Sequence, residues 1–159
     1  MRLGYLIALV LFAGVLISGM SCGRQNEQMQ SLTRHQRLWA QQGIVSYQYR
    51  LQVNCFCPPE VTGPFIVQVR DGTPSSVLYA ATGKPAESRY SEKYDTIDEM
   101  FLVIEDGIRR KAAEISVTYN ETLGFPTSIY IDFVRQAVDD EIAYGVTEFQ
   151  TSQIVWGGA

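Results

Sequence analysis

Residues 45–57 constrain the fold more than any other part of the sequence, because apolar and polar residues alternate there without a break. A period of two is typical of a β-strand with one buried and one exposed face. Pro58 and Pro59 follow directly and should end the strand, since proline has no N–H for a sheet ladder. A long half-buried strand needs partner strands and a covering layer. The residues expected to face the core are Val45, Tyr47, Tyr49, Leu51, Val53, Cys55 and Cys57.

Five further segments have the alternation and composition of strands. Asp71-Gly72 joins the first two of them in a tight hairpin, a turn that favours these residues. Residues 81–95 are rich in Gly, Pro, Ser and charge, which predicts an exposed connection. The five predicted strands are residues 65–70, 77–79, 114–120, 127–134 and 141–150.

Two segments have the period of amphipathic helices. In residues 31–42, Leu32, His35, Leu38 and Trp39 share one face, and Gly43 can close the helix in a left-handed cap. The second helix follows a capping box formed by Thr96 and Glu99. Its apolar stripe consists of Ile97, Met100, Phe101, Ile104 and Ile108.

The order of these elements is α-β-β-β-α-β-β-β, which predicts the α+β class. We expect an antiparallel sheet of about six strands covered by the two amphipathic helices. The two halves have similar plans, and a Gly-x-Pro turn feeds a strand at residues 72–77 and again at 124–129. Either a duplicated αβββ unit or convergent hairpin chemistry explains this similarity.

The N-terminus has the pattern of an export signal. Arg2 precedes an apolar run over residues 3–17, and small residues then lead to Cys22. This resembles a bacterial lipoprotein signal, in which the cysteine is acylated and becomes the first mature residue. Gly19 stands where that pattern usually has a branched aliphatic residue. Ordinary secretion and a retained transmembrane anchor are the alternatives, and all three place the rest of the chain outside the cytoplasm.

This pattern gives the expected division of the chain. Residues 1–21 form the signal peptide, residues 22–30 a polar tether, and residues 31–159 a single α+β domain. Without residues 1–21, the chain has 12 Lys and Arg against 17 Asp and Glu, a net charge of −5. Nucleic acid is therefore not an expected partner, and electrostatic attraction to anionic lipid is disfavoured.

Cys55 and Cys57 form the motif with the clearest potential for chemistry, as a disulfide or as a pair of thiols. On a flat strand their Cα atoms would be roughly 6–7 Å apart, at the upper edge of the disulfide range, so a disulfide needs a local bend. With Cys22 acylated, an even pair is left in an oxidising compartment. A disulfide and two buried free thiols fit this pattern equally well, and redox catalysis fits less because the motif is not Cys-x-x-Cys.

Other candidate chemistry is weaker. A zinc site of Cys55, Cys57 and His35 lacks an evident fourth ligand, so we expect the single histidine either to pack on its helix face or to be exposed. A Ser-His-Asp hydrolase is improbable without a nucleophile motif. The acidic run at residues 139–141 fits a solvated turn better than a calcium loop. We therefore expect no catalytic residues, no metal and no cofactor.

Several motifs together resemble a family of exported bacterial proteins, many of them lipoproteins, that is known only as a domain of unknown function. The resemblance covers most of residues 36–150. It implies location and a compact domain, and it implies no activity. The residues that carry it are Trp39, Ser46-Tyr47-x-Tyr49, Cys55-Phe56-Cys57-Pro58, Tyr94-Asp95-Thr96-Ile97-Asp98, Gly124-Phe125-Pro126-Thr127 and Ile131-Asp132.

The sequence thus predicts a lipoprotein of the cell envelope, attached to a lipid bilayer through Cys22 on its periplasmic or cell-surface face. Its expected role is a non-catalytic binding or structural module, with an envelope protein as partner. The alternative is an envelope thiol-redox or metal-binding protein that uses Cys55 and Cys57.

Overall fold

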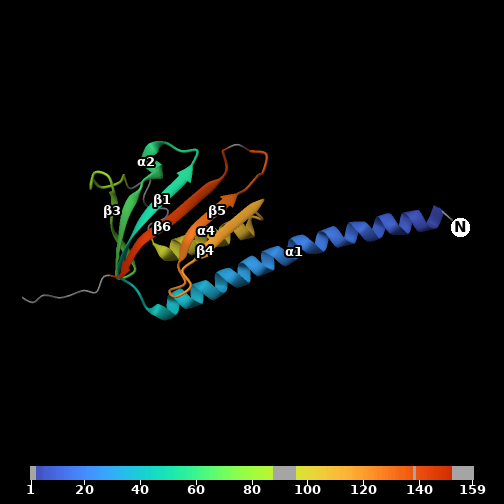
Figure 1. The fold of residues 1–159 in the computed structure, drawn as a ribbon, viewed down its shortest axis with the longest axis horizontal. Helices are drawn as coiled ribbons and strands as arrows, with labels where there is room; N and C mark the ends of the chain where they lie inside the picture. Colours follow the sequence, from blue (N-terminus) through green and yellow to red (C-terminus); the bar gives the residue numbers. More distant parts are fainter. Residues whose placement is uncertain (1–2, 88–95, 138, 152–159) are drawn as a thin grey trace, which may run out of the picture.

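The computed structural model describes residues 3–87, 96–137 and 139–151, with side chains from residue 23 onward. The described chain has the α+β class, with a six-stranded antiparallel sheet and three helices (Figure 1). Tyr94 and Asp95 of the family pattern lie outside the described residues. The elements in chain order are α1 (Leu3–Gln42), β1 (Tyr47–Cys55), α2 (Pro59–Thr62), β2 (Phe65–Arg70), β3 (Thr73–Tyr79), α4 (Ile97–Arg109), β4 (Glu114–Tyr119), β5 (Pro126–Asp132) and β6 (Ile142–Thr151).

The strands have the order β3-β2-β1-β6-β5-β4, and every neighbouring pair is antiparallel. Two meanders, β1-β2-β3 and β4-β5-β6, meet where β1 pairs with β6 along most of its length. This pairing places Cys55 opposite Ile142, so the end of β1 lies beside the start of β6. The β5–β6 turn therefore comes close to the cysteine pair.

Helices α1 and α4 pack side by side on one face of the sheet. Both contact Tyr47: Trp39 of α1 meets its ring edge-on at 5.4 Å, and the backbone N–H of Ile97 donates to its hydroxyl at 3.0 Å. The buried residues of β1 alternate as expected. All five residues of the predicted α4 stripe are buried, which confirms the helical face that the period indicated.

Local signals at the ends of elements are also confirmed. The Thr96 side chain accepts a hydrogen bond from the backbone N–H of Glu99 at 3.1 Å and caps α4. Asp71 and Gly72 both have positive φ, as the tight hairpin requires. Gly43 has φ +60° at the end of α1.

The local structure differs from the expectations at three places. Residues 23–30 belong to helix α1 and are not an extended tether. β1 ends before Pro58 and Pro59, as expected, but a four-residue helix that was not expected, α2, begins at Pro59, because proline suits the first position of a helix. Val45 and Cys57 lie outside β1, and Val45 is 53% exposed.

The topology also argues against a duplicated αβββ unit. Superposing β1-β2-β3 on β4-β5-β6 in chain order keeps the strand order but reverses every strand, because β1 and β4 run in opposite directions. Such a superposition turns the sheet over and would place α1 and α4 on opposite faces. Since both helices cover the same face, the local sequence echo is better explained by similar hairpin chemistry.

Among the residues whose side chains the structure describes, from residue 23 onward, no helix combines the length and the hydropathy needed to cross a membrane. Cys22 lies in the helical backbone of α1.

Candidate functional site

Cys55 and Cys57 are joined by a disulfide, with a Cα–Cα distance of 5.2 Å. This distance is shorter than a flat strand allows, because β1 ends at Cys55 and the chain bends before Pro58. Both cysteines are half-buried, whereas the Phe56 side chain between them is 84% exposed. The bridge therefore holds a large aromatic side chain in solvent at the end of the central strand.

The disulfide lines a hollow of about 590 Å³, which we call the disulfide hollow. It lies between the end of β1, the outer face of α4 and the chain around the β5–β6 turn. The Leu102 side chain is 60% exposed here, on the side of α4 away from its buried stripe. The lining residues are Cys55, Cys57, Glu99, Leu102, Val103, Asp106, Arg110, Ile131, Phe133, Asp139, Asp140, Glu141, Ile142 and Tyr144.

Arg110 connects the acidic and the aromatic parts of this lining. Its Nη1 lies 3.3 Å from Oδ2 of Asp106, and its guanidinium carbon lies 4.0 Å from the centre of the Phe133 ring. A guanidinium over an aromatic face is a favourable arrangement. The lining thus holds five carboxylates and one guanidinium, and its surplus charge is negative.

Asp140 departs from the solvated turn that the sequence suggested. Both of its carboxylate oxygens are buried, and neither has a hydrogen-bond partner among the described residues. A buried carboxylate without a donor is costly, and native structures rarely leave one unsatisfied. A ligand that donates hydrogen bonds at this position would remove that cost.

The pKa of Tyr130, on β5 near the β5–β6 turn, is raised above its ordinary value. Partial burial is the largest cause, and the nearby carboxylates of Asp132, Glu141, Glu114 and Asp140 add to it, because they disfavour a second negative charge. These four carboxylates therefore make the immediate surroundings of the Tyr130 hydroxyl negative.

His35 was weighed with Cys55 and Cys57 as a zinc ligand, but it lies in the core and not at the disulfide. It is buried, its Nδ1 is 2.8 Å from the Ser31 carbonyl oxygen, and its ring stacks on Tyr119 at 3.8 Å. Burial raises the pKa of Tyr119 to about 12, although Arg34 partly opposes the shift. Of the two expected states of His35, packing and exposure, the structure shows packing. Among the described residues, no group of three or more His, Cys, Asp or Glu side chains could hold a metal ion.

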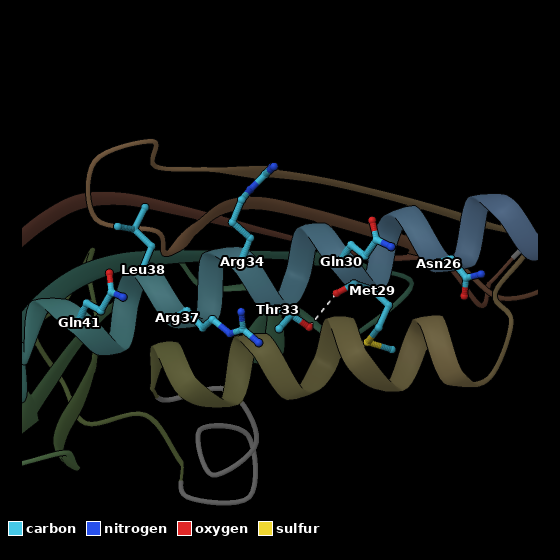
Figure 2. Close-up of a pocket in the computed structure, with 8 residues that line it drawn as sticks. All are labelled: Asn26, Met29, Gln30, Thr33, Arg34, Arg37, Leu38 and Gln41. Atoms are coloured by element: carbon cyan, nitrogen blue, oxygen red, sulfur yellow. Dashed lines mark hydrogen bonds between the residues drawn. The ribbon is translucent and has the colours of Figure 1, made fainter.

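A second hollow, of about 610 Å³, runs along α1 (Figure 2). All eight of its described lining residues come from this one helix. Figure 2 shows that Met29 and Arg37 point toward α4, whereas Gln30 and Arg34 point to the other side. Side chains that do not converge cannot define a ligand, so this hollow is a weaker candidate than the disulfide hollow.

Sequence reasoning found the two cysteines but missed the rest of the site. Leu102 carried a usable signal, because it is a large apolar residue outside the stripe of its helix. Phe56 carried another, as an aromatic residue on the polar side of the alternation. Asp140 carried none, because its burial depends on the pairing of β1 with β6.

Replacing both Cys55 and Cys57 with Val is expected to lower the free energy of unfolding by about 1–2 kcal/mol. A ring this small removes little entropy from the unfolded chain. The double Ala variant should lose up to about 1 kcal/mol more, because it leaves unfilled space. Urea denaturation of the wild type and both variants measures the difference. If the pair has a redox function, the double Val protein would fold normally and still lose its biological effect.

Comparison with known families assigns most of the chain to one family. A family model described as a family of unknown function (DUF6174) matches residues 31–151. This region runs from within α1 to the end of β6 and includes the disulfide hollow. No curated protein and no solved structure matches the chain. The expected membership in a family of unknown function is confirmed: the chain belongs to the DUF6174 family through most of its length.

Proposed function

We propose that this protein is an exported lipoprotein of the cell envelope that acts as a non-catalytic binding module, with the disulfide hollow as its binding site. The observation that carries the proposal is Phe56, an aromatic side chain 84% exposed between two bridged cysteines beside that hollow. Exposed apolar patches on small domains are typical of interaction sites. Because the bridge fixes the chain on both sides of Phe56, little conformational entropy is lost when a partner covers it.

The lining of the hollow suggests the chemistry of the partner. Leu102 and Phe133 supply apolar contact area, and five carboxylates supply hydrogen-bond acceptors. Asp140 has two buried oxygens without a hydrogen-bond partner among the described residues. A protein segment that presents an apolar side chain next to a Lys, an Arg or free backbone N–H groups fits this combination. The net negative charge of the domain supports a protein partner over nucleic acid.

A non-catalytic role is supported by how the reactive side chains are used. His35 is stacked in the core, and both thiols near the hollow are joined in the disulfide. The rival proposal, an envelope thiol protein, requires that this bond be reduced and re-formed during function. Thiol titration of the unfolded protein from cells, with and without reductant, distinguishes the two, since a readily cycled pair supports the rival.

For the anchor, Cys22→Ser is expected to move the protein from the membrane fraction to the soluble fraction, because the serine hydroxyl cannot form the thioether to a diacylglyceryl group. Cell fractionation followed by immunoblotting measures the distribution. Mass spectrometry of the wild-type mature N-terminus is the control. An unmodified Cys22 there would contradict the lipoprotein proposal.

For binding, Phe56→Ser is expected to lower capture of the partner from native membranes at least about tenfold, since exposed aromatic anchors commonly contribute 2 kcal/mol or more. Val45→Ser is the matched control, because Val45 is also an exposed apolar residue but lies before the other end of β1. Quantitative mass spectrometry of the captured proteins gives the ratio. Equal losses in the two variants would contradict a site at the disulfide.

A further inference from the structure

A third hollow, of about 680 Å³, lies where α1 leaves the sheet domain. Arg24, Lys111 and Arg135 line it, together with one acid, Glu114. These residues come from α1, from the chain just after α4, from the β5–β6 turn and from β4, so the fold brings together cations that are far apart in sequence. We call this set of three cations and their hollow the basic hollow.

The three cations are free to bind an anion. All three side chains are exposed, and none forms an ion pair with another described residue. The neighbouring Arg109 and Arg110 differ, since they pair with Glu105 and Asp106.

The basic hollow lies close to Cys22, and this position determines which surface faces the hollow. Arg24 lies two residues after Cys22 in the same helix, a rise of about 3 Å. Gln28, which also lines the hollow, donates through Nε2 to the Ile115 carbonyl at 3.3 Å and holds α1 against β4. If Cys22 is acylated, as the proposed function has it, the hollow is therefore held at the membrane surface.

We propose that the basic hollow docks the domain onto the membrane by binding the phosphate groups of anionic phospholipids. The net charge of the domain argues against lipid binding only if all charges act together. Charges separated by more than about 8–10 Å are screened at physiological ionic strength. Beside the anchor, the basic hollow holds three cations and one carboxylate, so its local charge is positive. Docking would fix the orientation of the domain on its membrane.

The sequence provides a direct probe, because Lys111 and Lys84 are the described lysines and both are exposed. The mature protein from native membranes is reconstituted in vesicles of phosphatidylcholine, with or without phosphatidylglycerol as a third of the lipid. An amine-acylating reagent is added, and mass spectrometry gives the modification rate of each lysine. Lys84, which follows β3 and lies outside the hollow, is the internal reference.

Lys111 should react at least about fivefold more slowly in the anionic vesicles, with Lys84 unchanged, because each cation near an anionic surface contributes roughly a fivefold factor. The double variant Arg24→Gln, Arg135→Gln should abolish this protection. The double variant Arg34→Gln, Arg37→Gln should keep it, since it removes the same charge from α1 outside the basic hollow.

Three results would overturn the inference. Lys111 could react equally in both kinds of vesicle, it could be protected equally by phosphatidylcholine alone, or free inorganic phosphate could protect it as well as the anionic vesicles do. Flotation of the vesicles separates this inference from the anchor. A chain that fails to float contradicts both, whereas a chain that floats with an unprotected Lys111 contradicts the lipid site alone.

Discussion

Replacing Ile104 with Asp is expected to unfold the domain. Ile104 is 1% exposed and lies in the middle of the buried stripe of α4. The change removes a large apolar side chain from the core, which costs about 2–5 kcal/mol, and places an unpaired carboxylate there at further cost. The sum is comparable to the whole stability of a domain this size, about 5–15 kcal/mol. Circular dichroism and urea denaturation measure the loss.

Leu102→Asp is the matched control, because it introduces the same charge two residues away on the same helix. Leu102 is 60% exposed, so the new carboxylate stays solvated, and the cost should be below about 1 kcal/mol. Equal tolerance of the two changes would contradict the placement of the buried face of α4.

Replacing Gly124 with Ala is expected to lower the free energy of unfolding by about 3 kcal/mol or more. Gly124 has φ +89°, and a Cβ atom there would lie 2.6 Å from the His35 carbonyl oxygen and 2.8 Å from the Trp39 amide nitrogen. These atoms belong to the backbone of α1, so the strand connection and the helix would have to separate. The adjoining Phe125 would move with them and weaken its contact with Trp39.

Gly83→Ala measures the backbone contribution alone. Gly83 has φ +67°, and a Cβ atom there meets nothing within 4 Å. Its cost should be about 1 kcal/mol, the usual penalty for a left-handed non-glycine residue. Thermal unfolding of both variants gives the comparison. If Gly124→Ala cost no more than Gly83→Ala, the close packing of α1 on the β4–β5 connection would be refuted.

The sequence was sufficient for the elements whose signals are local. The alternation in β1, the stripe and cap of α4, and the Asp71-Gly72 hairpin each depend on residues close in the chain, and each is confirmed. Short helix α2 was missed because four residues are too few for a helical period. The helical conformation of residues 23–30 was missed because those residues have no apolar period of their own.

The disulfide hollow and the basic hollow could not be predicted, because they depend on which strands pair and on where α1 packs. β1 and β6 are far apart in sequence, yet their pairing brings Cys55 beside Ile142 and the acidic turn that precedes it. In the same way, Arg24, Lys111 and Arg135 meet only because α1 is held against β4. Net charge described the whole domain correctly but did not show that three cations meet at one hollow.

The most direct test of the account places a photoreactive amino acid at position 56 in living cells. The central claim is that a protein partner covers the disulfide hollow, so irradiation should give one discrete crosslinked species. The yield should fall when Leu102→Asp is added, because that change alters the hollow without unfolding the domain. The same probe at position 45, an exposed apolar residue before the other end of β1, should give no such species. Equal crosslinking from positions 45 and 56, or a yield at 56 that Leu102→Asp leaves unchanged, would contradict the claim.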